Sequence, residues 1–252
     1  MIFKVSYCIE HGRNKQASED SALIGKTVIN DECGTLEIAS PAWICLCDGV
    51  GGNAGGREAS LFVTQELSSI IPPNSVEEVR KIFVNINNRL LERASNSINH
   101  KTMATTATAI CFSDEAVFLA HVGNTRLYSK RGPYMQQMTI DQTTYQWFID
   151  QGDFEAAEVC NKNEIRGAMG GGTQALLNSF VAKQLFERKI PSILLLTSDG
   201  IHEYLSQDDM ENILFSDKIS IDKVNRICSG SLHQGSDDDR SAILIEQINA
   251  CD

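Results

Sequence analysis

The sequence predicts an α+β fold, a β-sandwich of two antiparallel sheets flanked by helix pairs. Apolar, β-prone segments occur in blocks, and helical segments stand in pairs between and after these blocks. Short connections between consecutive strands indicate antiparallel pairing, because a parallel pair needs a crossover of roughly a dozen residues. This order fits two packed sheets covered by helices better than it fits alternating βαβ units.

The first block predicts three strands and then a pair of helices. Alternating apolar residues place the strands at residues 2–8, 21–29 and 36–47. The first helix covers residues 58–71 and ends at Pro72 and Pro73, because proline lacks an amide donor and has a fixed φ. The second helix begins after Ser75, which forms a capping box with Glu78.

The second block predicts short strands followed by elements of mixed type. The strands lie at residues 105–112, 116–122, 126–129 and 134–138. The next segment predicts a helix at 144–151, a glycine cluster at 170–172 and a strand at 179–187. The chain then continues with a strand at 193–197, helices at 207–215 and 221–229, and a strand at 241–248.

The composition indicates a single domain, residues 1–252, with enough apolar content (42%) for a substantial core. The net charge of −11 argues against nucleic acid or an anionic membrane as a partner, because an acidic surface offers them no counter-charge. No apolar stretch approaches the roughly 18 residues of a membrane span, and the N-terminus lacks the form of a signal peptide. We therefore expect a cytoplasmic protein, with a monomer as the default.

The eight cysteines show no CxxC spacing, so a metal-binding or redox motif is not predicted. Cys45 and Cys47 are two apart in an apolar strand and share one face, which favours small core side chains over ligands. A reducing compartment is the default for such a chain. His121, also in an apolar strand, is expected to be a core histidine with its hydrogen bonds satisfied.

Three acidic stretches carry the chemical information. Asp48 follows an apolar strand and opens a glycine-rich segment, Asp199 follows another strand, and Asp238 precedes the last one. Taken singly, an Asp-Gly pair after a strand is most often a turn. Carboxylates at three strand ends could instead converge on Mg²⁺ or Mn²⁺, which prefer oxygen ligands and activate water for phosphoester hydrolysis.

Seven motifs, in order from about Glu19 to Ile245, resemble those of the metal-dependent type 2C serine/threonine protein phosphatases. The matching segments are residues 48–60 (the family's DGMGGHxxGExAS), 104–107 (GTTA), 122–126 (VGDSR), 138–143 (LTxDHS), 163–170 (NxxTRALG), 198–200 (SDG) and 238–241 (DNxT). Seven ordered motifs are far more specific than any single one. The family fold is the same sandwich of two antiparallel sheets with helix pairs.

The resemblance implies a catalytic site that binds two Mn²⁺ or Mg²⁺ ions through three aspartates and one backbone carbonyl, those of Asp48, Asp199, Asp238 and Gly49. Glu19 and Asp20 match an acidic pair that supports the water around the metals. The segment 141–190 is expected to contain the flap beside the active site.

Four departures from the family pattern are singled out because they bear on the site or lie in its motifs. Lys15 stands where an arginine usually grips the substrate phosphate, and a lysine lacks the bidentate fork. Asn124 replaces an aspartate that helps to hold a third ion in bacterial relatives, so we expect weaker third-metal binding. Arg57 replaces a glutamate and Gly167 replaces an arginine, and the sequence alone gives no account of either.

The leading hypothesis is hydrolysis of phosphoserine and phosphothreonine by attack of a metal-bridging water. The substrate would be a phosphoprotein made by a serine/threonine kinase, in a signalling role. One alternative is a non-catalytic regulator or binding module with the same fold. Another is a metal-dependent phosphohydrolase acting on small molecules.

Overall fold

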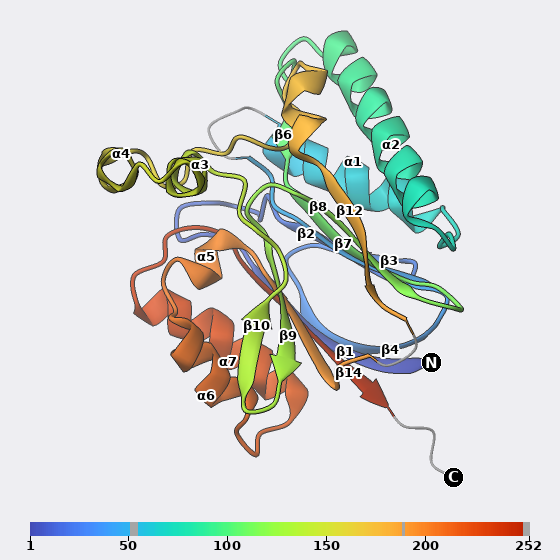
Figure 1. Ribbon diagram of the computed structural model, residues 1–252, viewed down its shortest axis with the longest axis vertical. Helices are drawn as coiled ribbons and strands as arrows, with labels where there is room; N and C mark the ends of the chain where they lie inside the picture. The colour runs from blue at the N-terminus through green and yellow to red at the C-terminus, as the bar shows by residue number, and fades with distance from the viewer. Residues whose placement is uncertain (51–54, 188–189, 249–252) are drawn as a thin grey trace.

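The computed structural model describes residues 1–50, 55–187 and 190–248, which form helix, sheet, sheet and helix layers (Figure 1). One sheet contains, in spatial order, β12 (Val181–Phe186), β8 (Val117–Val122), β7 (Ala107–Phe112), β5 (Ala42–Cys47), β2 (Ser21–Ile24) and β3 (Thr27–Ile29). The other contains β10 (Tyr134–Gln137), β9 (Arg126–Arg131), β13 (Ile193–Thr197), β14 (Arg240–Ile248), β1 (Ile2–Glu10) and β4 (Cys33–Ala39). Neighbouring strands in both sheets are antiparallel, so the predicted fold class is confirmed.

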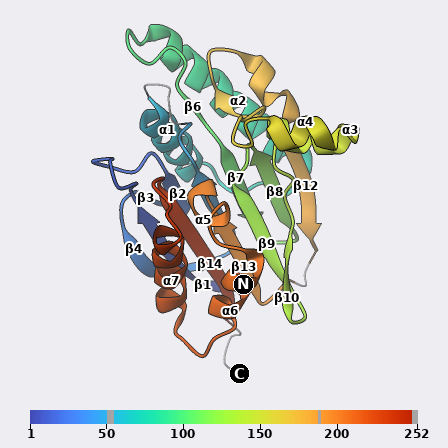
Figure 2. The ribbon, with the colours of Figure 1, turned by 90° about the vertical axis from the view of Figure 1, so that its left-hand side faces the viewer.

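Helices cover the outer face of each sheet (Figure 2). The β5-containing sheet packs against α1 (Gly56–Ser68) and α2 (Val76–Asn96), and the β14-containing sheet packs against α6 (Gln207–Leu214) and α7 (Ser220–His233). Apolar side chains fill three separate cores, one under each helix pair and one between the sheets. None of the described helices combines the length and apolarity needed to cross a bilayer.

Smaller elements lie outside these layers. The segment after β10 carries α3 (Thr144–Gln151) and α4 (Phe154–Val159), which project from one side of the sandwich (Figure 1). A short bridge pairs β6 (Ala104–Thr105) with β11 (Met169–Gly170), next to the 3-10 helix Gln174–Ser179. The helix α5 (Asp199–His202) follows β13 directly.

Two predicted strands are wrong in length, because each is a pair of strands. Residues 21–29 form the β2–β3 hairpin, in which Gly25 takes the left-handed conformation (φ 63°) that glycine permits. Residues 36–47 divide between β4 and β5 at Ser40-Pro41. The expected cap of α2 is confirmed, since the Ser75 side chain accepts the backbone N–H of Glu78.

The buried cysteines and His121 agree with expectation, but one cysteine pair does not. Cys45 and Cys47 are fully buried, and His121 bonds the Thr108 hydroxyl and the Ile140 carbonyl oxygen. Burial lowers the pKa of His121 to about 4, so its ring is neutral at pH 7.

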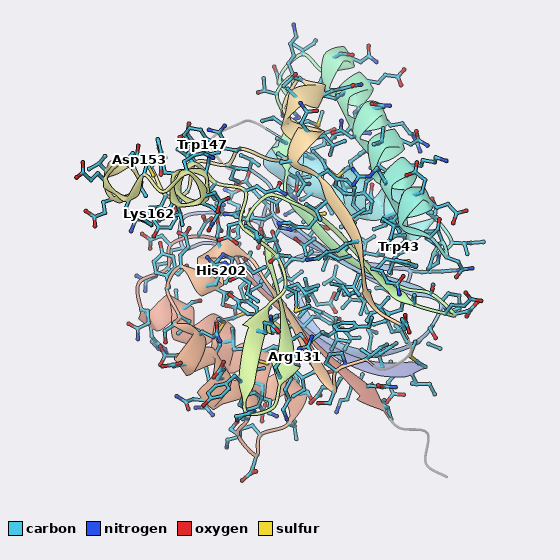
Figure 3. All side chains as sticks on the ribbon, viewed as in Figure 1. Trp43, Arg131, Trp147, Asp153, Lys162 and His202 are labelled. Carbon is cyan, nitrogen blue, oxygen red and sulfur yellow. A yellow bond between two sulfur atoms is a disulfide. The ribbon has the colours of Figure 1, made fainter. Side chains whose placement is uncertain are left out.

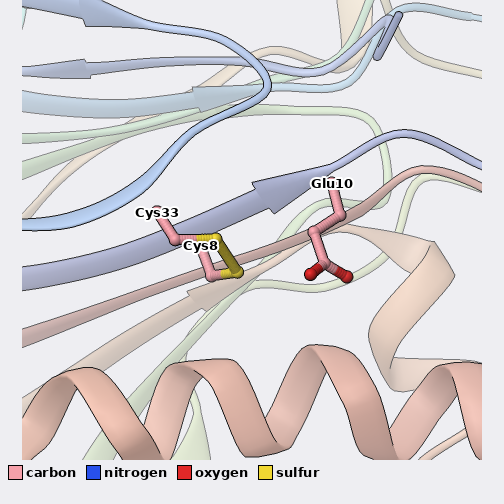
Figure 4. A group of neighbouring side chains, drawn as sticks. All are labelled: Cys8, Glu10 and Cys33. Carbon is pink, nitrogen blue, oxygen red and sulfur yellow. A yellow bond between two sulfur atoms is a disulfide. The ribbon is translucent and has the colours of Figure 1, made fainter. Parts of the chain in front are cut away.

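A disulfide joins Cys8 on β1 to Cys33 on β4, where the two residues face each other across the strands (Figure 4). Strand register creates this pair. The sequence alone does not predict the pair, because the two cysteines are 25 residues apart.

The core under α1 and α2 centres on aromatic side chains. Phe83 is fully buried on α2, and its ring lies 5.3 Å from that of Phe180 and 6.2 Å from that of Trp43. We expect Phe83→Ala to lower the free energy of unfolding by about 3–5 kcal/mol, since it removes these contacts and leaves a cavity. Urea unfolding measures this loss. Val84→Ala, at a neighbouring side chain that is 38% exposed, is the control and should cost under about 1 kcal/mol. Equal losses in the two variants would contradict the packing argument.

Candidate active site

The ends of strands from both sheets meet at one end of the sandwich and bring acidic residues together. Asp48 follows β5 and Asp20 precedes β2, which pairs with β5 in antiparallel register. Asp199 follows β13 and Asp238 lies just before β14, which pairs with β13 in the same way. The two sheets therefore each contribute two aspartates to this end, which we call the acidic cluster.

Asp48 and Asp199 lie close enough together for their carboxyl groups to interact. Burial raises the pKa of Asp48 well above its ordinary value, and the negative charges of neighbouring aspartates, Asp199 first, raise it further. The pKa of Asp199 is raised by its burial and by the charge of Asp238. Like charges held this close disfavour the ionised form, unless a cation offsets them.

Asp20 is fully buried, and its charge interacts with those of Asp48 and Asp199. Its Oδ2 accepts the Ser241 hydroxyl at 2.6 Å, and its Oδ1 has no hydrogen-bond partner. Burial, followed by the charges of Asp239 and Asp199, raises the pKa of Asp20 to about 8. A buried carboxylate oxygen without a donor is costly, so this oxygen marks a place where a cation or its water would be stabilising.

Asp238 lies at the rim, with its side chain 52% exposed, and contacts Lys15. The Lys15 ammonium lies 3.0 Å from Asp238 Oδ1, 3.0 Å from Glu19 Oε2 and 2.8 Å from Asp239 Oδ2. An ammonium group has three N–H donors. Three carboxylates therefore engage all the donors of Lys15, the residue expected to contact phosphate.

Glu19 and the Gly49 carbonyl approach the same point from two loops. A Cβ on Gly56 would lie 2.8 Å from Glu19 Oε1 and 3.2 Å from the Gly49 oxygen, so both oxygens face this position. The Gly49 N–H also donates to the Glu19 backbone oxygen at 3.2 Å. The rest of this glycine-rich motif, residues 51–54, lies outside the described residues.

Asn124 reaches the cluster from the turn between β8 and β9. Its Nδ2 donates to Asp199 Oδ2 at 3.0 Å, and its Oδ1 is buried without a hydrogen-bond partner. The amide thus supplies a hydrogen-bond donor to Asp199, whereas an aspartate in its place would supply a second negative charge.

The structure brings the expected residues together, but not into one tight shell. The carboxylate oxygens of Asp48, Asp199 and Asp238 do not all lie within 4.8 Å of one another. Among the described residues, the group that meets this limit is Cys8, Glu10 and Cys33, whose sulfur atoms are joined in the disulfide (Figure 4). The Asp238 carboxylate is directed to Lys15 instead.

The donor set nevertheless fits divalent cations. It consists only of oxygens, it includes the unpaired Oδ1 of Asp20, and the charges of neighbouring aspartates raise the pKa of Asp20, Asp48 and Asp199. Mg²⁺ and Mn²⁺ prefer such oxygens, and their charge would offset the repulsion. Thiol or imidazole ligands typical of zinc do not occur among these contacts.

Two unexplained departures now have a physical account. The Arg57 guanidinium donates to the Ser18 carbonyl at 2.9 Å and lies 3.4 Å from Asp31, so it anchors the loop that leads to Glu19. A Cβ on Gly167 would lie 2.1 Å from Gln142 Oε1 and 2.3 Å from Ser179 Oγ, so a side chain there would displace the hydrogen bond between these two residues.

Asp239 is a site residue that sequence reasoning missed. Its side chain is 3% exposed and accepts the N–H groups of Gly12 (2.7 Å) and Glu19 (2.8 Å) in addition to the Lys15 ammonium. The sequence does indicate this residue, because Asp239 stands where the DNxT motif has asparagine. Three converging donors, one of them charged, suit a carboxylate better than an amide.

Comparison with known proteins identifies the family of this chain. The family model for protein phosphatase 2C matches residues 20–225, which is more than half of the chain. The chain is 24% identical over 215 residues to the serine/threonine phosphatase stp of Listeria monocytogenes, and the match covers 81% of this chain and 84% of that protein. The protein phosphatase PhpP of Streptococcus pneumoniae is 25% identical over 215 residues, covering 82% and 86%.

Solved structures share the fold. The serine/threonine phosphatase Stp1 from Staphylococcus aureus superposes with a TM-score of 0.79 at 24% identity, covering 97% of this chain and 95% of that one. The catalytic domain of PstP, crystallised with two manganese ions, gives a TM-score of 0.77 at 20% identity, covering 99% and 100%. With the family model and these relatives, the chain belongs to the protein phosphatase 2C family.

Proposed function

We propose that this protein is a metal-dependent protein serine/threonine phosphatase that hydrolyses phosphoserine and phosphothreonine. The observation that carries the proposal is the acidic cluster, in which Asp48, Asp199, Asp20 and Asp238 lie close enough for their charges to interact. The named activity of the stp and PhpP relatives supports the same substrate class.

Asp48, Asp199, Asp238 and the Gly49 carbonyl would hold two Mn²⁺ or Mg²⁺ ions, with Glu19 and Asp20 hydrogen-bonded to water around them. When bound, such ions neutralise the charge of a phosphoryl group and make a water nucleophilic at neutral pH. The two manganese ions in the PstP crystal structure support this number of ions.

The remaining residues of the site position these carboxylates. Asp239 tethers the Gly12–Glu19 segment through two backbone N–H groups, and Lys15 draws Asp238 Oδ1 toward this segment. In this arrangement Lys15 offsets negative charge within the cluster. To contact a substrate phosphate, it must release one of its three carboxylates.

The alternative, a non-catalytic regulator on the same fold, receives less support. A binding module has no need of Asp48, Asp199 and Asp238, and buried carboxylates whose charges repel one another destabilise a fold that never binds a cation. The full set of aspartates therefore favours the enzyme.

The domain organisation, location and partners of the enzyme are proposed from its likeness to the family. We propose one phosphatase domain whose flap lies within residues 141–190, of which 188–189 lie outside the described residues. We also propose a cytoplasmic monomer that acts in signalling on phosphoproteins made by a serine/threonine kinase.

The first prediction concerns the metals and Asp48. With Mn²⁺, the protein should release phosphate from a phosphothreonine peptide and from an aryl phosphate, and a chelator should abolish both reactions. Asp48→Ala should lower kcat by about a thousandfold or more, because it removes a carboxylate from the proposed metal site. Asp114→Ala, at an exposed turn residue, is the matched control and should keep full activity. Full activity of Asp48→Ala would refute the proposed role.

The second prediction concerns the number of tightly bound ions. Metal analysis after gel filtration in low Mn²⁺ should find two ions per chain, because Asn124 offers Asp199 an N–H donor and no charge. Asn124→Asp should add a third ion, since a hard cation gains a full negative charge. Three tightly held ions in the unaltered protein would contradict this account.

The third prediction concerns Lys15. Burial alone would lower its pKa, but hydrogen bonds to Asp239 and Glu19 and the charge of Asp238 raise it above the ordinary value. Lys15→Gln should therefore lower the free energy of unfolding of the metal-free protein by about 1–3 kcal/mol, after allowing for its partial exposure. Lys81→Gln, which breaks an exposed ion pair with Glu77 on α2, should cost under about 0.5 kcal/mol.

Product inhibition separates this role from phosphate binding. Lys15→Gln with saturating Mn²⁺ should raise the inhibition constant of inorganic phosphate by less than about threefold. A rise of more than tenfold without loss of stability would show instead that Lys15 is a phosphate ligand.

A further inference from the structure

A cavity of about 350 Å³ lies beside α3, outside the acidic cluster. We call it the α3 pocket, and its walls come from β8, β12, α3 and the segment after β10. Three large apolar side chains on its walls are open to solvent, namely Ile140 (66% exposed), Trp147 (41%) and Val181 (38%). Figure 3 shows Trp147 on α3, at the side of the molecule. Exposed apolar groups gathered around a hollow are typical of a site that binds another molecule.

Two cations also line the α3 pocket. Within the described residues, neither Arg166 nor Lys183 forms an ion pair. The Arg166 guanidinium stacks 4.6 Å from the centre of the Trp147 ring, and Lys183 Nζ donates to the Met138 carbonyl at 3.0 Å. Their charges are therefore available to a ligand.

The acidic side chains of the pocket do not cancel this charge. Asp141 is neutralised by Arg126, whose guanidinium donates to both of its oxygens. Asp150 accepts the side-chain amide of Gln146 at 2.8 Å and is the remaining carboxylate of the lining. The pocket is thus locally positive in a chain whose net charge is −11, which favours an acidic ligand.

Gln142 and the turn between β8 and β9 connect the α3 pocket to the acidic cluster. Gln142, which lines the pocket, accepts the Gly123 N–H with its side chain and donates its own N–H to the Gly123 carbonyl, both at 2.9 Å. The next residue, Asn124, contacts Asp199. Along this series of contacts, the turn at Gly123 and Asn124 separates the lining of the pocket from Asp199.

We propose that the α3 pocket docks the segment of the phosphoprotein substrate that flanks the phosphorylated residue. It selects a segment that combines an acidic side chain, for Arg166 and Lys183, with a bulky apolar side chain, for the wall formed by Ile140, Trp147 and Val181. This inference rests on the proposed phosphatase function and specifies which phosphoproteins the enzyme takes.

The test compares phosphothreonine peptides of equal length whose flanks differ. One peptide carries Asp and Phe beside the phosphothreonine, a second carries Lys and Phe, and a third carries Asp and Ser. We expect the unaltered enzyme to favour the first over the second by about tenfold or more in kcat/KM, mainly through KM. One or two ion pairs and a buried ring are worth a difference of this size.

Variants of the pocket should change the preference itself. The double variant Arg166→Glu and Lys183→Glu should have a higher kcat/KM for the Lys–Phe peptide than for the Asp–Phe peptide. Ile140→Ser should lower the ratio of kcat/KM between the Asp–Phe and Asp–Ser peptides. Arg131→Glu, at an exposed cation in the β9–β10 turn, is the matched control and should leave both ratios unchanged. Figure 3 shows Arg131 far from Trp147 in this view. Thermal unfolding of each variant establishes that it is folded.

The outcomes separate this inference from the function on which it rests. If the unaltered enzyme hydrolyses an aryl phosphate, and its kcat/KM is the same for all three peptides, then docking in the α3 pocket is wrong and the phosphatase function stands. Ratios that stay the same in the pocket variants overturn the inference as well. If neither the aryl phosphate nor any peptide is hydrolysed with saturating Mn²⁺, the proposed function itself fails.

Discussion

Repulsion among the carboxylates at one end of the sandwich is the constraint on which the rest of the structure depends. Burial and neighbouring charge raise the pKa of Asp20 from 3.8 to about 8, which corresponds to several kcal/mol of unfavourable interaction. The inter-sheet core opposes this cost, because each fully buried side chain such as Ile44 or Ile243 contributes about 1.5–3 kcal/mol. Asp48 and Asp199 come from different sheets, so packing of the sheets is what holds the two carboxylates together.

Each residue that departs from the family pattern makes specific contacts with the residues around it. Lys15 lies among three carboxylates, one of which is Asp239, where the family motif has asparagine. Arg57 binds the loop before Glu19, and Gly167 makes room for Gln142. Each change thus belongs to a contact between two or more residues, which explains why Arg57 and Gly167 could not be interpreted from the sequence alone.

The sequence predicted the fold class and most elements because apolar periodicity reports directly which faces are buried. The helix at Thr144–Gln151 and the strand at Ile193–Thr197 have the predicted bounds. Hairpins inside apolar runs were missed, since the turn at Gly25 depends on a single φ angle that composition does not display. The partners of the site aspartates were also out of reach. The Cys8–Cys33 pair and the contacts of Asp239 join residues that only the strand register and loop packing bring together.

The position of β14 in its sheet has a consequence for how the protein matures. This strand pairs with β1 along the whole of β1, from Ile2 opposite Ile248 to Glu10 opposite Arg240, and with β13 on its other side. A ribosome adds roughly 5–20 residues per second, so β14 is synthesised on the order of tens of seconds after β1. During that interval neither Asp238 nor the strand that orients it is available to the other aspartates. The acidic cluster is therefore incomplete until residue 248 has left the ribosome and β14 has paired with β1 and β13.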